Sequence, residues 1–283
     1  SHTTAGCLWP AEWDTLRDMS MAQSMLDGRY PADPILSGET LWYNPLTGTI
    51  IAAASLALQR PLNETSIILG PYVNLLIPVG IALLLWCLFG RTAAIAGVCM
   101  VLFAKDPQIP FWVNAGYSPW LLAPLYSLGL FFFTLAVFYY ALSRRSLTGY
   151  IAGGVLLGLT FMAHTAPALV TGGIMLLMTG TECVLFWRSL PGGEGDVNKG
   201  WLQLVLHFCV LLAVAFVVSL PFTWSILWNY QFRIQNPFPS LFAADYVSLA
   251  QLPERLYDGL NWRNFFAAAG LLALLRRLRS DRA

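Results

Sequence analysis

Residues 67–89 read IILGPYVNLLIPVGIALLLWCLF and contain no charged side chain. A helix needs about 20 mostly apolar residues to cross the hydrocarbon core of a bilayer, and this stretch is long enough. The stretches 119–142 and 201–224 meet the same criterion, and 166–187 meets it if its polar side chains face other helices. The sequence therefore predicts an all-α fold, a polytopic bundle of transmembrane helices.

Three further apolar runs are shorter, and we expect them to be buried or to cross a locally thin bilayer: 92–104, 150–163 and 265–275. With these runs the chain has seven predicted spans. The run that begins at Leu46 is also short, and we expect a helix over 46–60 that lies at the membrane interface. The polar segments 1–45 and 225–263 are predicted loops on one side of the membrane.

Composition sets the class of protein. The chain is 57% hydrophobic and 11% charged, with a mean hydropathy of +0.61, which excludes a water-soluble domain of this length. A formal net charge of +1 argues against nucleic acid as a partner. The five cysteines are scattered without a C-x-x-C pair, so they are interpreted as small packing residues rather than metal ligands.

The orientation follows from the basic residues, which favour short cytoplasmic linkers. With the loop 1–45 outside, the short inner linkers and the tail carry Arg91, Arg144, Arg145, Arg188, Lys199, Arg276, Arg277, Arg279 and Arg282. The much longer outer loops carry Arg17, Arg29, Arg60, Lys105, Arg233, Arg255 and Arg263. This difference in density predicts that residues 1–45 and 225–263 are extracytoplasmic.

The outer loops hold the candidate chemical groups. Asp14 and Asp18 lie four residues apart, so on a helix they would share a face and could act as a base or hold a divalent cation. They could equally form a solvated acidic face with Arg17 as counter-ion. His164 is either a packing residue or a donor to an anionic phosphate. Lys105 could also bind a phosphate, or pair with its neighbouring aspartate.

A resemblance to a known family rests on the order of several motifs. Asp14 is followed by an alanine eight residues later, then by LDGRYPADP over 26–34 and WYNPL over 42–46. This order resembles the first extracytoplasmic loop of GT-C glycosyltransferases, which are polytopic enzymes that use polyprenyl-phosphate-linked sugars. The similarity extends over residues 9 to 187. Because the family has a membrane helix before this loop, we expect the chain to be a fragment lacking its first helix.

The resemblance implies transfer of a sugar from a polyprenyl-phosphate donor to a hydroxyl of a glycan, lipid or protein. The reaction would take place at the extracytoplasmic face of a plasma (inner) membrane. Asp14 would be the catalytic carboxylate. Many members of the family have paired acids where this chain has Asp14-Thr15, so Asp18 or Glu12 could substitute. The substrate-binding residues would be drawn from Glu12, Tyr43, Lys105, His164 and Arg233, and the lipid tail would follow an aromatic face such as 131–133.

The alternative is a non-enzymatic membrane protein, either a transporter or an assembly subunit. Transporters place ionisable residues near the bilayer midplane and interrupt their spans there with glycine or proline. Pro78 and Pro124 lie within predicted spans, but few charges do. This distribution favours chemistry at the membrane surface.

The predicted orientation can be tested by cysteine labelling in a cysteine-free background. Ser118→Cys should react with an impermeant maleimide added from the extracytoplasmic side. Ser146→Cys should react only after the membrane is opened, because the predicted span 119–142 separates the two positions. If both positions react from the same side, the number of spans between them is not the predicted one.

Overall fold

The computed structural model describes residues 4–103, 116–188, 197–229 and 231. Several positions singled out above lie outside the described residues, namely Lys105, Arg233, the span 265–275 and most of the loop 225–263.

Within the described residues the chain is helical apart from loops, turns and one isolated antiparallel β-bridge between Ala32 and Thr40. The α-helices are α1 (Trp13–Leu26), α2 (Leu46–Leu58), α3 (Leu62–Val73), α4 (Leu76–Phe89), α5 (Arg91–Phe103), α6 (Ala123–Arg144), α7 (Leu147–Ala163), α8 (Thr165–Arg188) and α9 (Val197–Trp224). α9 continues into a turn of π-helix, η1 (Ser225–Asn229). The predicted all-α fold is confirmed.

Four stretches are long and apolar enough to cross a membrane: Leu62–Phe89, Ala123–Arg144, Thr165–Phe186 and Gly200–Asn229. α2, α5 and α7 are shorter apolar helices. On the outer surface of α8 and α9, Leu177 is 72% exposed and Val217 is 65% exposed, as expected for side chains that face lipid. The protein is therefore a multi-pass membrane protein.

The first long apolar run, predicted as one helix over 67–89, is divided in the structure. α3 ends immediately before Asn74, and α4 begins two residues after it. Pro71 lacks a backbone N–H and its ring crowds the preceding turn, which weakens a helix at this point. The Asn74 amide donates to the carbonyl oxygens of Ser118 and Trp120, at 2.8 and 2.6 Å, and so ties the break to the segment before α6.

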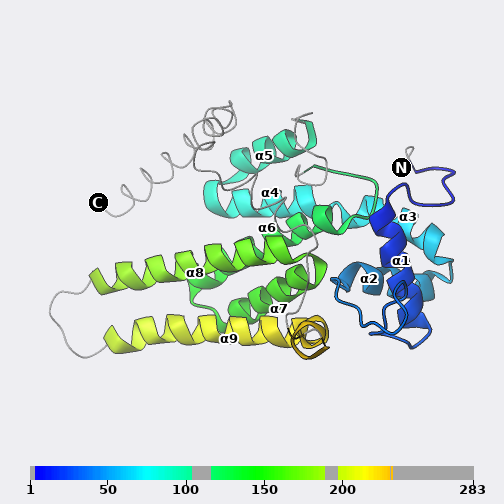
Figure 1. The fold of residues 1–283 in the computed structure, drawn as a ribbon. Coiled ribbons are helices and arrows are strands. Elements are labelled where there is room, and N and C mark those ends of the chain that lie inside the picture. The colour runs from blue at the N-terminus through cyan, green and yellow to red at the C-terminus, as the bar shows by residue number, and fades with distance from the viewer. Residues whose placement is uncertain (1–3, 104–115, 189–196, 230, 232–283) are drawn as a thin grey trace, which may run out of the picture. The chain divides into compact units, whose positions relative to one another are not determined.

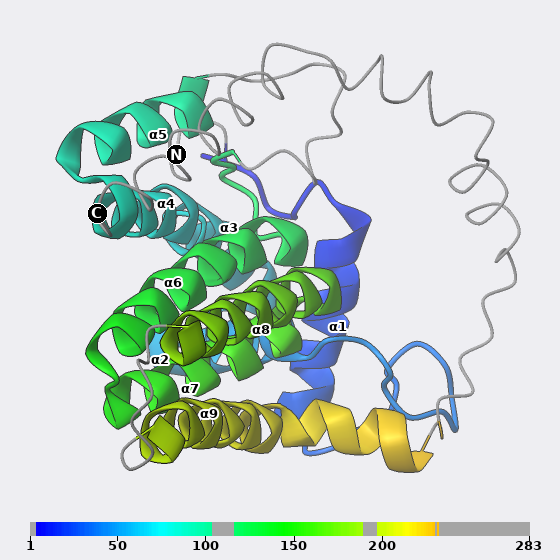
Figure 2. The same cartoon turned by 90° about the vertical axis from the view of Figure 1, so that its left-hand side faces the viewer.

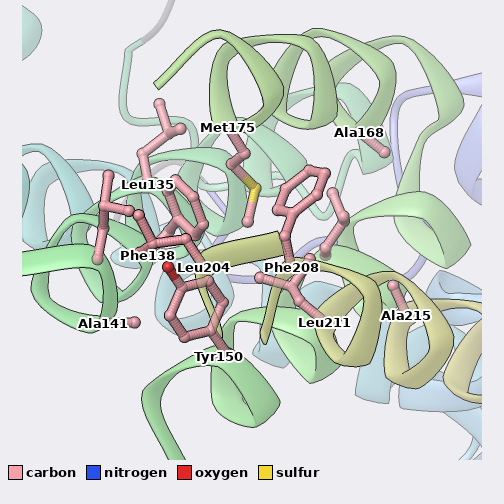
Figure 3. Close-up of a cluster of buried hydrophobic side chains, with 12 residues drawn as sticks. Leu135, Phe138, Ala141, Tyr150, Ala168, Met175, Leu204, Phe208, Leu211 and Ala215 are labelled. Atoms are coloured by element: carbon pink, nitrogen blue, oxygen red, sulfur yellow. The ribbon is translucent and has the colours of Figure 1, made fainter. Parts of the chain in front are cut away.

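The longest helices pack around a shared apolar core. Figure 3 shows side chains from α6, α7, α8 and α9 converging there, and Phe138, Tyr150 and Leu211 are fully buried. α7 approaches α9 closely, because a Cβ on Gly154 or Gly158 would lie 2.5 or 2.8 Å from a backbone oxygen of α9. Small residues permit this kind of close packing between membrane helices.

The first three helices gather at one end of the longer ones. α1 runs across the ends of α6 to α9 (Figures 1 and 2). It rests on α2 at Gly48, where an added Cβ would lie 3.2 Å from the carbonyl oxygen of Asp18. The hydroxyl of Thr15 donates to the carbonyl oxygen of Leu121, 3.2 Å away, just before α6. α1 thus forms part of the predicted loop 1–45, and α2 covers most of the predicted interfacial helix 46–60.

Segments from the predicted outer loops meet at this end of the bundle. The hydroxyl of Ser225, at the start of η1, donates to the carbonyl oxygen of Leu41 at 2.8 Å. Asn44 donates to the carbonyl oxygen of Phe161 at 2.6 Å, near the end of α7. At the opposite ends of the helices, the guanidinium of Arg145 lies 5.2 Å from the ring centroid of Phe186. The described outer segments therefore share one end of the bundle.

Gly129 offers a test of the packing between α6 and α4. A Cβ at Gly129 would lie 2.6 Å from the carbonyl carbon of Leu76, so Gly129→Ala must move one helix backbone. We expect a loss of about 1–3 kcal/mol in the free energy of unfolding. Gly173→Ala, where nothing lies within 4 Å of the added atom, is the matched control and should leave stability unchanged or slightly higher. Thermal unfolding in detergent measures both, and equal stability of the two variants would contradict the close contact.

Candidate active site

α1 presents its charged residues on one flank. Glu12 is the N-cap residue in an extended conformation, although its side chain does not cap the helix. Asp14 lies in the first turn, where the helix dipole favours a negative charge. Asp14 lies three residues before Arg17 and four before Asp18, the spacing at which side chains of a helix meet, whereas Arg17 and Asp18 are adjacent in sequence. Helical spacing therefore accounts for the pair between Asp14 and Arg17, while the long Arg17 side chain also reaches the carboxylate next to it in sequence.

The Arg17 guanidinium binds both carboxylates. Its Nη1 lies 3.0 Å from Asp14 Oδ1, and its Nη2 lies 3.1 Å from Asp18 Oδ1. Its Nε donates to the same oxygen of Asp18 at 3.3 Å. The Asp14 side chain is 57% exposed, whereas the Asp18 side chain is 1% exposed. The cluster therefore has one carboxylate that solvent and ligands can reach and one that lies beneath it.

Tyr43 brings the WYNPL segment to this cluster. The Arg17 guanidinium carbon stands 3.5 Å from the centroid of the Tyr43 ring, a cation–π contact. The neighbouring Asn44 fixes the segment against the α7–α8 junction, because its amide donates to Phe161 O at 2.6 Å and to Thr165 Oγ1 at 3.2 Å. Burial raises the pKa of Tyr43 more than the nearby Arg17 lowers it, so the phenol stays protonated at neutral pH.

His164 lies between α7 and α8, on the same side of the protein. Its Nδ1 accepts a hydrogen bond from the backbone N–H of Ala166 at 3.3 Å. Burial lowers the pKa of His164, and the positive charge of Arg17 lowers it further. The imidazole is therefore neutral at pH 7 and carries its proton on Nε2, since Nδ1 acts as acceptor. In this form His164 can donate one hydrogen bond to a ligand.

Asp18 is the most perturbed group of the cluster. Burial raises the pKa of its carboxyl to about 6, and this effect outweighs the opposing influence of Arg17. Oδ1 is bonded to Arg17, while the buried Oδ2 has no hydrogen-bond partner among the described residues. A buried acid of this kind is held near the boundary between its charged and neutral forms at ordinary pH.

Three of the residues predicted from sequence contact Arg17, namely Asp14, Asp18 and Tyr43. His164 lies near enough for the charge of Arg17 to lower its pKa. Glu12 lies at the start of the same helix, and Lys105 and Arg233 lie outside the described residues. Sequence reasoning treated Arg17 as a counter-ion and missed that it is the centre of the cluster. The available signal was an acid three residues before Arg17 on the predicted helix and a second acid directly after it. Asn44 was also missed, and a lone asparagine in a loop gives no such signal.

The predicted divalent cation would have to compete with Arg17. Both carboxylates that could bind it are already paired with the guanidinium. Across the described part of the chain, no group of three or more histidine, cysteine, aspartate or glutamate side chains is arranged to hold a metal ion. The positive charge at this site is supplied by the chain's own arginine.

An apolar groove lies where the first loop meets the end of α9. It has a volume of about 460 Å³ and is formed by Tyr30 and Pro31 of the first loop and by the end of α9, including Leu220 and Trp224. On α9, the ring of Phe222 contacts Phe161, whose carbonyl oxygen holds Asn44. In the aromatic run 131–133, predicted as a lipid-binding face, Phe131 and Phe132 are partly buried and pack against the core of the bundle.

Comparisons with known proteins were made at three levels. No family model, no curated protein and no solved structure matches this chain.

The raised pKa of Asp18 predicts how stability depends on pH. Because the folded protein binds this proton more tightly than the unfolded chain, stability falls as the pH rises from about 4 to about 6. The full effect is about 3 kcal/mol, the equivalent of two pKa units. Asp18→Asn removes it, so the variant should gain stability relative to the wild type between pH 4 and pH 7 in chemical unfolding.

Asp27→Asn is the control for this experiment. Hydrogen bonds from Gln23 and Arg29 lower the pKa of Asp27, so its contribution is present above its ordinary pKa and lost as the pH falls. The stability of Asp27→Asn relative to the wild type should therefore not increase between pH 4 and pH 7. A difference between Asp18→Asn and wild type that stays constant over this range would show that the Asp18 pKa is not raised.

Proposed function

We propose that the protein is a membrane glycosyltransferase that moves a sugar from a polyprenyl-phosphate donor to an acceptor hydroxyl. We place the reaction on the extracytoplasmic side of a plasma (inner) membrane. The observation that carries the proposal is the cluster around Arg17, in which an exposed carboxylate stands beside a buried charge pair at one end of a membrane bundle. The order of motifs shared with GT-C enzymes supports the same activity.

The reaction would be a displacement at the anomeric carbon. The acceptor oxygen forms a bond to that carbon while the bond from the carbon to the phosphate oxygen breaks. The acceptor proton passes to the Asp14 carboxylate, which is exposed and able to reach a bound hydroxyl. The electron pair of the broken bond leaves with the lipid phosphate, so its negative charge increases. A hydrogen bond from neutral His164 and the charge of Arg17 would stabilise that phosphate.

Asp18 would serve this reaction indirectly. With 1% of its side chain exposed, it does not reach a substrate, but it holds the Arg17 guanidinium through two nitrogen atoms. Arg17 in turn binds Asp14 and lies against Tyr43. Asp18 is therefore a positioning residue, and Asp14 is the group proposed to take part in the chemistry.

The lipid portion of the donor would lie in the groove between the first loop and the end of α9. The groove is mostly apolar, and it opens beside Val217, which is 65% exposed on the face of α9 expected to meet lipid. Ser225 connects this end of α9 to Leu41, two residues before Tyr43. A lipid seated there would have its phosphate end directed toward the segment that carries the cluster.

The test compares Asp14→Asn with Asp27→Asn in the full-length protein. Losing a general base typically reduces the rate about 10²- to 10⁴-fold, so Asp14→Asn should abolish transfer while the protein still accumulates normally. Asp27 is an exposed residue at the end of α1, and its substitution should change stability by no more than about 0.5 kcal/mol. The measurement is sugar transfer from a polyprenyl-phosphate donor in membranes.

The outcome decides among the acids of the first loop. Full activity in Asp14→Asn would transfer the role of base to Glu12, because the buried Asp18 does not reach a substrate. If Asp14→Asn, Asp18→Asn and Glu12→Gln were all active, the residues assigned here would not be catalytic. If the wild type transferred no sugar from any such donor, the transporter or assembly-subunit alternative would be favoured.

A further inference from the structure

A second hollow lies on α1, away from the Arg17 cluster. It has a volume of about 540 Å³ and is bordered by α1, the end of α2 and the start of α3. Leu16, Ser20 and Gln23 line it from α1, at the three- and four-residue spacing of a single helical stripe. Asp14 and Arg17 belong to a different stripe of the same helix. The hollow is therefore a site separate from the candidate active site.

The hollow has an aromatic wall. Trp9 forms this wall and is 62% exposed, although it lies within a folded segment. The Asn63 amide donates to the carbonyl oxygen of Leu8 at 2.7 Å, which fixes the residue next to Trp9 against the start of α3. A large indole surface held in this way, and left open to solvent, offers a flat apolar platform for a ligand.

The polar groups of the hollow are uncharged and are arranged to accept hydrogen bonds. Gln23 uses its amide nitrogen to bind Asp27 at 2.7 Å, and Asn63 uses its nitrogen for Leu8, so both amide oxygens remain as acceptors. The hydroxyls of Ser20 and Ser55 donate to backbone carbonyls, at 3.0 and 2.5 Å, and keep their own lone pairs. A ligand that fits this rim must bring several hydrogen-bond donors.

No charged side chain lines the hollow. A phosphate, a nucleotide or an acidic sugar would therefore find no cation there, and a cationic ligand would find no carboxylate. A neutral ligand rich in hydroxyl groups, with one apolar face to lie on the indole, suits both the acceptor groups and the aromatic wall. Neutral sugars have this character, because their axial C–H bonds form an apolar face and their hydroxyls form a donor-rich edge. The volume lies within the range of about 300–1,000 Å³ typical of small-molecule sites.

We propose that this hollow binds a neutral oligosaccharide, with one sugar ring stacked on Trp9 and its hydroxyls bonded to Gln23 and Asn63. This assignment rests on the residues that line the hollow and does not depend on whether the protein transfers sugars. In combination with the proposed function, it identifies a second saccharide contact on α1, on a different flank from Asp14. An acceptor glycan could then be held at a distance from the reacting hydroxyl.

The experiment is a binding titration with the purified protein in lipid nanodiscs, which avoids detergents that carry sugar head groups. Maltotriose, cellotriose and mannotriose are the probes, and saturation-transfer NMR reports their binding. We expect at least one trisaccharide to bind with a dissociation constant of about 1 mM or lower. Trp9→Ala should weaken that binding about tenfold or more, because it removes the stacking surface.

The matched control is Trp13→Ala. Trp13 is 84% exposed and close to Trp9 in sequence, yet it does not line the hollow, so its loss should leave affinity unchanged. Gln23→Leu keeps the bulk of the side chain but removes the acceptor, and it should weaken binding even if Trp9→Ala folds poorly. Asp14→Asn should bind the trisaccharide as well as the wild type, which separates this proposal from the catalytic one.

Two results would overturn the proposal. One is the absence of saturable binding by all three trisaccharides to the wild-type protein. The other is an equal loss of binding in Trp13→Ala and Trp9→Ala, since the tryptophans would then act as general surface anchors at the membrane interface.

Discussion

The charge pair between Arg17 and Asp18 is the interaction on which the arrangement of the first loop depends. A carboxylate that is 1% exposed cannot stay ionised without a cation beside it, and a partly buried guanidinium needs an anion in return. The pair allows α1 to rest on α2 at Gly48 with charged residues on its flank. Arg17 also contacts Asp14 and Tyr43, so the positions of these two side chains depend on the same ion pair.

The sequence predicted the class of fold because the membrane imposes a simple rule. Long apolar runs must form helices that satisfy their own backbone hydrogen bonds, and the runs at 119–142 and 201–224 correspond to α6 and α9. The break at Asn74 was not predicted, because it depends on hydrogen bonds to Ser118 and Trp120, more than forty residues away. A hydropathy pattern predicts which segments leave water, but it does not predict which distant carbonyl group the side-chain amide of Asn74 will bind.

The candidate site was predictable in part for a different reason. Asp14 and Asp18 share a helix, so their spacing alone indicated a common face. Tyr43 and His164 were included through the order of motifs. The structure places the Tyr43 ring against Arg17, and the charge of Arg17 lowers the pKa of His164. The Asn44 bonds to Phe161 and Thr165 make this arrangement specific. Hydrogen bonds between residues more than one hundred positions apart form only in the packed fold, so they cannot be predicted from local sequence patterns.

The contrast between the two carboxylates shows how burial can assign different roles to neighbouring acids. The raised pKa of Asp18, about 6, suits a general base working near neutral pH. A base must, however, come within about 2.6–3.2 Å of the proton-bearing oxygen, and the buried Asp18 does not face an open space. Asp14 is exposed, adjoins the same arginine and lies on the open side of the cluster. We therefore assign the role of base to Asp14, because it is accessible to a substrate. The raised pKa of Asp18 reflects the burial of its carboxyl beneath Arg17.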